Sequence, residues 1–97
     1  MVIQMTDRNL GKFYITDEAI RQNPDKIAVL FSLLKIVPVR AEYIFCRNSI
    51  EYIAIGIRFE EVPLGQEIPE YKIEIGEDRL GNIDLVEVIK IDKKEIL

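Results

Sequence analysis

The sequence contains no histidine and a single cysteine, Cys46. Histidine is the commonest general base and a frequent metal ligand, so its absence excludes most catalytic dyads and zinc sites. Cys46 has no second cysteine to bond within the chain and no histidine to take its proton. We therefore interpret it as a small, partly buried apolar residue. The lack of a disulfide framework is typical of a reducing compartment.

Glycine-rich phosphate loops are also missing, because the five glycines are scattered singly along the chain. The carboxylates alternate outward in the strand patterns, and none has the apolar surroundings that general acid catalysis requires. Asp78, Asn82 and Asp84 fall near one turn without the spacing of a calcium-binding loop. We expect no enzymatic activity, no cofactor and no metal site.

The charge is acidic and unevenly spread. Residues 1–48 carry seven basic and five acidic side chains, whereas residues 49–97 carry six basic and twelve acidic ones. Phosphate contacts need positive charge, so the acidic half disfavours nucleic acid as a partner and would suit a basic protein. Most of the excess lies between positions 60 and 78, at Glu60, Glu61, Glu67, Glu70, Glu74, Glu77 and Asp78.

Long hydrophobic runs are absent as well. The most apolar segment, residues 27–39, is interrupted by Ser32, Lys35 and Pro38, and is too short to span a bilayer. Residues 1–5 lack the charged region and apolar stretch of a signal peptide. We expect a soluble, cytoplasmic protein with no membrane contact.

What the chain does contain is enough apolar sequence for one core: 48% of its 97 residues are hydrophobic. We expect a single α+β domain over residues 1–97. Thr16 followed by two acids predicts a short helical turn over 17–22. Asn23 and Pro24 then predict a main helix from 24 to about 36, because Asn caps helices and Pro suits the first position. Its apolar arc spans about 200° and includes one charge, Lys26.

From residue 39 onwards the apolar period changes to two, which indicates strands. The pattern predicts strands over 39–47, 50–60, 70–75 and 83–91, joined as a four-stranded antiparallel meander against the helix. An N-terminal edge strand could extend this sheet. In the last strand, apolar residues occupy odd-numbered as well as even-numbered positions. This predicts a bulge near Val86 and Glu87 or burial of both faces.

With no chemistry indicated, we expect a non-enzymatic protein that binds another protein as an inhibitor or adaptor. Small acidic proteins of this kind are often encoded by viruses or mobile elements, and such an origin is our expectation. The predicted docking element is the loop after the second strand of the meander. Its apolar residues fit no strand or helix periodicity, and acidic residues flank them in the sequence. Its residues are Glu60, Glu61, Val62, Leu64 and Glu67.

We also expect a homodimer. The second strand is apolar on both faces, and basic residues of the first two strands complement acids of the third, as in a two-fold interface. The candidate interface comprises Tyr52, Ala54, Gly56 and Arg58. Ordinary cross-strand pairing of Arg58 with Glu70 or Glu74 is the alternative.

Two other functions remain open at this point. In the first, a small ligand occupies a pocket between helix and sheet, oriented by Tyr43, Tyr52 and Tyr71, with Ala54 and Gly56 making space. In the second, the protein is a structural component of a larger assembly.

Overall fold

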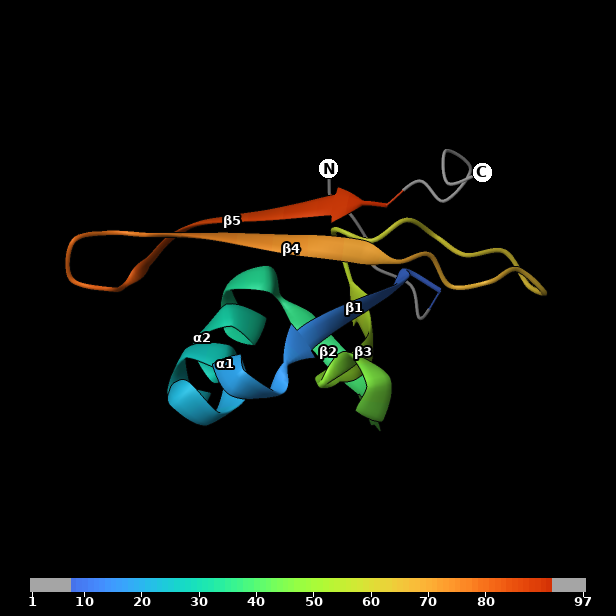
Figure 1. Ribbon diagram of the computed structural model, residues 1–97. Coiled ribbons are helices and arrows are strands. Elements are labelled where there is room, and N and C mark those ends of the chain that lie inside the picture. Colours follow the sequence, from blue (N-terminus) through green and yellow to red (C-terminus); the bar gives the residue numbers. More distant parts are fainter. Residues whose placement is uncertain (1–7, 92–97) are drawn as a thin grey trace, which may run out of the picture.

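A computed structural model describes residues 8–91 as an α+β fold with two helices and two antiparallel sheets (Figure 1). The elements in chain order are β1 (Leu10–Thr16), α1 (Asp17–Gln22), α2 (Pro24–Leu34), β2 (Ile36–Ile44), a 3₁₀ turn (Phe45–Arg47), β3 (Ser49–Gly56), β4 (Tyr71–Glu77) and β5 (Ile83–Lys90).

The helices begin where the sequence predicted. The Thr16 hydroxyl accepts a hydrogen bond from the Ala19 N–H, and the Asn23 side-chain oxygen accepts one from the Lys26 N–H, both at 3.2 Å. The main helix is shorter than expected and ends at Leu34. Lys35 takes up a left-handed conformation (φ 55°), which stops the helix and directs the chain at once into β2.

The first sheet has the strand order β1-β3-β2. The prediction of a four-stranded meander is therefore wrong, since the structure has five strands in two sheets. The N-terminal strand is a full partner, pairing with β3 from Leu10 opposite Ile55 to Thr16 opposite Ser49. Strand β2 begins before Pro38 rather than after it. Pro38 is tolerated because β2 lies at the sheet edge, where a missing N–H costs little, and a bulge follows at Val39.

The second sheet is the β4–β5 hairpin. It crosses over the helices in Figure 1 and is joined to the first sheet by an isolated parallel bridge, in which the Lys12 N–H donates to the Pro69 carbonyl at 3.0 Å. Its register shifts at Asp84, which is the extra residue, so the bulge lies near the turn and not at Val86 and Glu87. This shift brings Ile83 onto the same face as Val86 and Val88 and explains the mixed apolar registers of β5.

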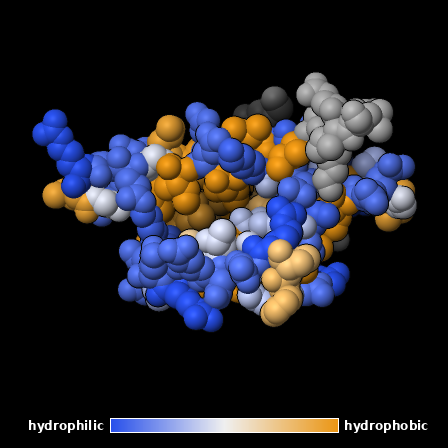
Figure 2. All heavy atoms as spheres, viewed as in Figure 1, coloured by the Kyte–Doolittle hydropathy of each residue, from blue (hydrophilic) through white to orange (hydrophobic). Residues whose placement is uncertain are grey.

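The core lies where the inner face of the first sheet, α2 and the hairpin meet. Phe13 in β1 is almost fully buried and packs edge-on against Phe31 of α2, with ring centroids 5.9 Å apart, and stacks on Tyr52 of β3 at 5.4 Å. Ile73, Ile83, Val86 and Val88 add the hairpin's contribution. Figure 2 shows hydrophobic side chains gathered in the upper middle of this face, with mostly hydrophilic ones below them. Part of the broad apolar arc of α2 packs into this core, through Leu30 and Leu34 with Ile27 and Phe31, whereas Val29 and Leu33 stay about half exposed.

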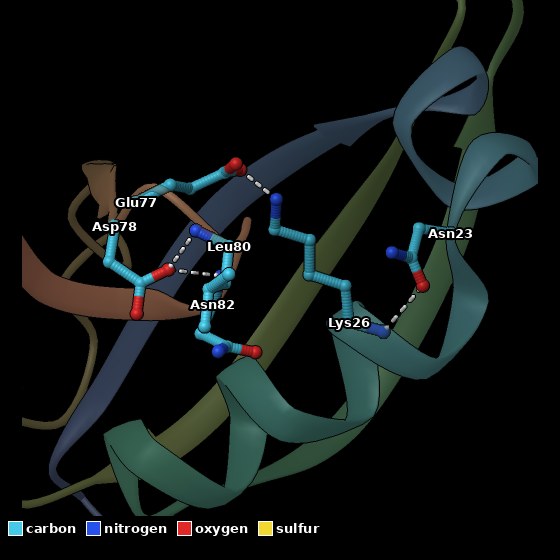
Figure 3. A network of polar contacts seen from close by, with 6 residues as sticks. All are labelled: Asn23, Lys26, Glu77, Asp78, Leu80 and Asn82. Carbon is cyan, nitrogen blue, oxygen red and sulfur yellow. Dashed lines mark hydrogen bonds and ion pairs between the residues drawn. The ribbon is translucent and has the colours of Figure 1, made fainter.

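Lys26, the one charge inside that arc, forms an ion pair with Glu77 at the end of β4 (Figure 3). Beside it, the Asp78 carboxylate accepts hydrogen bonds from the Leu80 and Asn82 backbone N–H groups, each at 2.9 Å, and so closes the hairpin turn. This network ties the distal end of the hairpin to the start of α2.

Candidate protein-binding surface

The segment between β3 and β4 is anchored by the core and by the backbone. Phe59 is buried between Phe13 and Tyr71, with ring centroids 6.3 and 4.8 Å away. The Tyr71 hydroxyl accepts a hydrogen bond from the Glu60 N–H at 2.9 Å. The Val62 N–H donates to the Arg8 carbonyl at 2.8 Å. The segment is thus held at its beginning and again at Pro69, whose carbonyl accepts from the Lys12 N–H, and the tip between these anchors presents its side chains.

Leu64 stands at the tip of this loop. Its side chain is 81% exposed, and it is followed by Gly65 in a left-handed conformation (φ 83°) within a turn in which the Gln66 N–H donates to the Pro63 carbonyl. Glu60, Glu61 and Glu67, which are exposed, lie within four positions of Leu64 in the sequence. They line a cleft of about 240 Å³ together with Val62, Pro63, Gln66, Pro69 and Lys90.

One predicted docking residue does not have the exposure that docking requires. Val62 is 9% exposed, because the loop turns its side chain inward at the bridge between Asn9 and Glu61. The alternation of apolar and polar residues in the strands does not continue into this loop, so the sequence pattern could not predict that Val62 is buried. Glu60 is engaged by Lys90 at 2.6 Å. Glu60 stays exposed in this pair, and Glu61, Leu64 and Glu67 are the other exposed residues of the predicted set.

The predicted dimer residues lie mostly inside the monomer. Ala54 has no exposed surface, and Gly56 is buried. A β-carbon at Gly56 would come within 2.6 Å of the Ile36 side chain and 3.2 Å of the Phe59 ring. The open space inferred from Ala54 and Gly56 is thus filled by Phe59 of the same chain.

The other two predicted dimer residues also have contacts within the monomer. Tyr52 is half-buried between Phe13 and Phe31, and burial raises its pKa. Arg58 donates to the Val86 carbonyl in β5 at 3.3 Å, while Glu74 pairs with Lys72 on its own strand. The sequence placed Arg58 opposite Glu70 or Glu74 because it assumed that β3 and β4 are neighbours, which they are not.

The three tyrosines of the predicted ligand pocket do not line one space. Tyr71 is buried against Phe59, and Tyr52 belongs to the aromatic cluster around Phe13. Tyr43 lies on the edge strand β2, where its hydroxyl donates to the Asn48 side chain at 3.3 Å. None of these three tyrosines lines the cleft beside α1, the cleft beside the loop after β3 or the cleft beside Leu33 and Arg58.

The outer face of the first sheet carries a polar row. The Tyr14 hydroxyl donates to the Glu51 carboxylate at 2.7 Å, and the Arg47 guanidinium lies 3.7 Å from the centre of the Tyr14 ring. Burial and this hydrogen bond raise the pKa of Tyr14 above its ordinary value of 10.0. Glu51 also lies directly opposite Glu42 in β2, so two like charges face each other across the ladder.

Strand β2 itself is the surface that the sequence reasoning missed. Within residues 8–91 no strand pairs with its second edge, and the side chains from Val37 to Tyr43 are exposed. Val37 and Val39 are more than half exposed. The available signal was Pro38 within an apolar run, since proline inside a strand indicates an edge position.

The described residues show few other candidates for chemistry. Cys46 is exposed in the 3₁₀ turn, and not partly buried as expected. Across residues 8–91, no group of three or more acidic or cysteine side chains is placed to hold a metal ion. None of the helices there is long and apolar enough to cross a membrane. The chain matches no protein-family model, no curated protein and no solved structure.

Proposed function

We propose that this protein is a non-enzymatic, homodimeric protein-binding protein of the inhibitor or adaptor kind, and that it docks through the tip of the loop around Leu64. The observation that carries the proposal is an exposed leucine at the tip of an anchored loop, next to a cleft that the exposed carboxylates of the same loop line with Pro63. An apolar anchor at the centre of a polar rim is the usual arrangement of a binding hot spot.

The proposed partner is a protein with an apolar pocket bordered by lysine or arginine. Glu61 and Glu67 supply the complementary charge, and Leu64 supplies the apolar contact. Rim charges of this kind raise the rate of association and make it dependent on salt. Because the backbone of the loop is already anchored at Phe59 and Val62, little ordering entropy would be lost on binding.

A photo-crosslinking residue at position 64 tests this directly in the cells that contain the protein. We expect a defined protein adduct from position 64, lost when Glu61→Lys and Glu67→Lys are introduced together. Position 80 is the matched control, because Leu80 is 85% exposed and also precedes a glycine of positive φ. Arg79 directly precedes Leu80, whereas no basic residue lies within five positions of Leu64 in the sequence. Equal adducts from positions 64 and 80 would reject the loop as the docking element.

A further inference from the structure

The free edge of β2 has a sequence that is complementary to itself. Arg40 and Glu42 flank Ala41 symmetrically, and in one chain their side chains form an ion pair at 2.7 Å. In an antiparallel pair of two β2 strands centred on Ala41, each Arg40 would lie directly opposite Glu42 of the second copy. Opposite charges at directly facing positions stabilise strand pairing.

We propose that two copies of this chain join through the edges of β2, antiparallel about a two-fold axis at Ala41, to form a continuous six-stranded sheet. This inference rests on the homodimer of the proposed function and names its interface. The strand order across the dimer is β1-β3-β2 followed by the same three strands in reverse, which pairs N–H and C=O groups of the two edges around Ala41, on the C-terminal side of the bulge at Val39.

The charges also select the register. A two-fold axis through Arg40 would place two guanidinium groups opposite each other, and an axis through Glu42 would do the same with two carboxylates. The register centred on Ala41 avoids both pairings.

Glu42 gives a second reason for this register. Within the monomer it lies opposite Glu51 of β3, so its carboxylate faces a like charge on one side. Arg40 of the second copy would flank Glu42 on the other side. The four side chains would then form an alternating cluster across the dimer axis, which favours this alignment over its alternatives.

Sedimentation velocity of the full 97-residue chain over a range of concentrations, with a charge-swap series, tests the inference. Arg40→Glu alone and Glu42→Arg alone each set like charges opposite each other twice per dimer. We expect each to weaken dimerisation by roughly tenfold. The double variant Arg40→Glu, Glu42→Arg restores opposite charges at both positions, and we expect it to dimerise about as well as the original chain.

The matched control is the Lys72–Glu74 pair on β4. It has the same spacing along one strand and nearly the same side-chain exposure, 63% and 49%, against 62% and 50% for Arg40 and Glu42. Lys72→Glu should leave dimerisation unchanged. Circular dichroism of every variant checks that the fold is retained, as expected for such exposed positions.

The outcomes separate the inference from the proposed function. A dimer that follows the swap pattern supports both. A dimer that ignores the swap, or that the double variant fails to restore, overturns the β2 interface and leaves the homodimer standing. A monomer at every concentration overturns both the interface and the homodimer, while docking through Leu64 is judged by the crosslinking experiment.

Discussion

The ammonium group of Lys26 in α2 is paired with the carboxylate of Glu77 at the end of β4 (Figure 3). Only a quarter of the Lys26 side chain is exposed, because it lies within the apolar arc of the helix. The pair therefore lets a charged residue occupy a largely buried position and links the helix to the distal part of the hairpin.

Removing the charge of Glu77 should destabilise the protein slightly. We expect Glu77→Gln to lower the free energy of unfolding by about 0.5–1 kcal/mol, since Glu77 is partly exposed and water screens the pair. Urea denaturation measures this. Glu74→Gln is the control, because it removes the same charge from the same strand where the pair stays within β4. Equal effects from the two variants would contradict a specific role for the Lys26 contact.

Gly11 is required by the ring of Phe59. A β-carbon at position 11 would lie 2.5 Å from the nearest ring carbon, closer than van der Waals contact allows. We expect Gly11→Ala to cost about 1–3 kcal/mol of unfolding free energy, measured by thermal or urea denaturation. Combining it with Phe59→Leu should cost less than the sum of the two single changes, because the smaller side chain relieves the clash. Simple additivity would show that the two residues are not in contact.

The side chain of Asn23 caps the main helix. Asn23→Ala should lower the unfolding free energy by about 1 kcal/mol, because the Lys26 N–H loses its side-chain acceptor at the helix terminus and keeps only the Asn23 carbonyl. Asn23→Ser keeps an oxygen that can accept this bond and should cost a few tenths of a kcal/mol at most. If serine proved as harmful as alanine, the amide would have to act in some way other than capping.

The stability of the fold should fall in alkaline solution, partly through Tyr14. Its pKa is raised in the folded state, so its contribution is complete below its ordinary value of 10.0 and is lost as pH rises through the folded-state pKa. Denaturation at a series of pH values should show a smaller alkaline loss for Tyr14→Phe than for the original chain. Glu51→Gln should also reduce the loss, because it removes the charge that Tyr14 faces. Identical alkaline slopes for the three proteins would contradict this.

Local signals in the sequence were sufficient to find the helices. Thr16 and Asn23 each cap a helix by accepting a hydrogen bond from the N–H three residues later. The residues that decide where each helix begins are therefore close together in the sequence. The existence of the β-strands was also readable from the apolar period of two. The boundaries of the strands were harder to predict. The left-handed conformation of Lys35 ends α2 early, so β2 begins within the range that was predicted as helix.

The partners of the strands could not be read in the same way. Strand β3 lies between β1 and β2, and its pairing with β1 joins residues about forty positions apart. The sequence predicted β1 as a possible edge strand, and β1 does lie at the edge of the first sheet, but its pattern of apolar residues could not show that it pairs with β3. The same non-local packing places the Phe59 ring over Gly11 and Gly56, so glycines that suggested an open pocket instead mark an occupied site.

The hairpin and the first sheet share side-chain packing and an isolated backbone bridge, not a continuous ladder. Hydrogen-bonded ladders open as cooperative units, so the β4–β5 hairpin can separate while β1, β2 and β3 stay paired. Such an opening would uncover Tyr71, Ile73 and Val88 together. Inside a cell, the hairpin would then be the part that a protease or chaperone meets first, and its opening would set the lifetime of the protein before complete unfolding does.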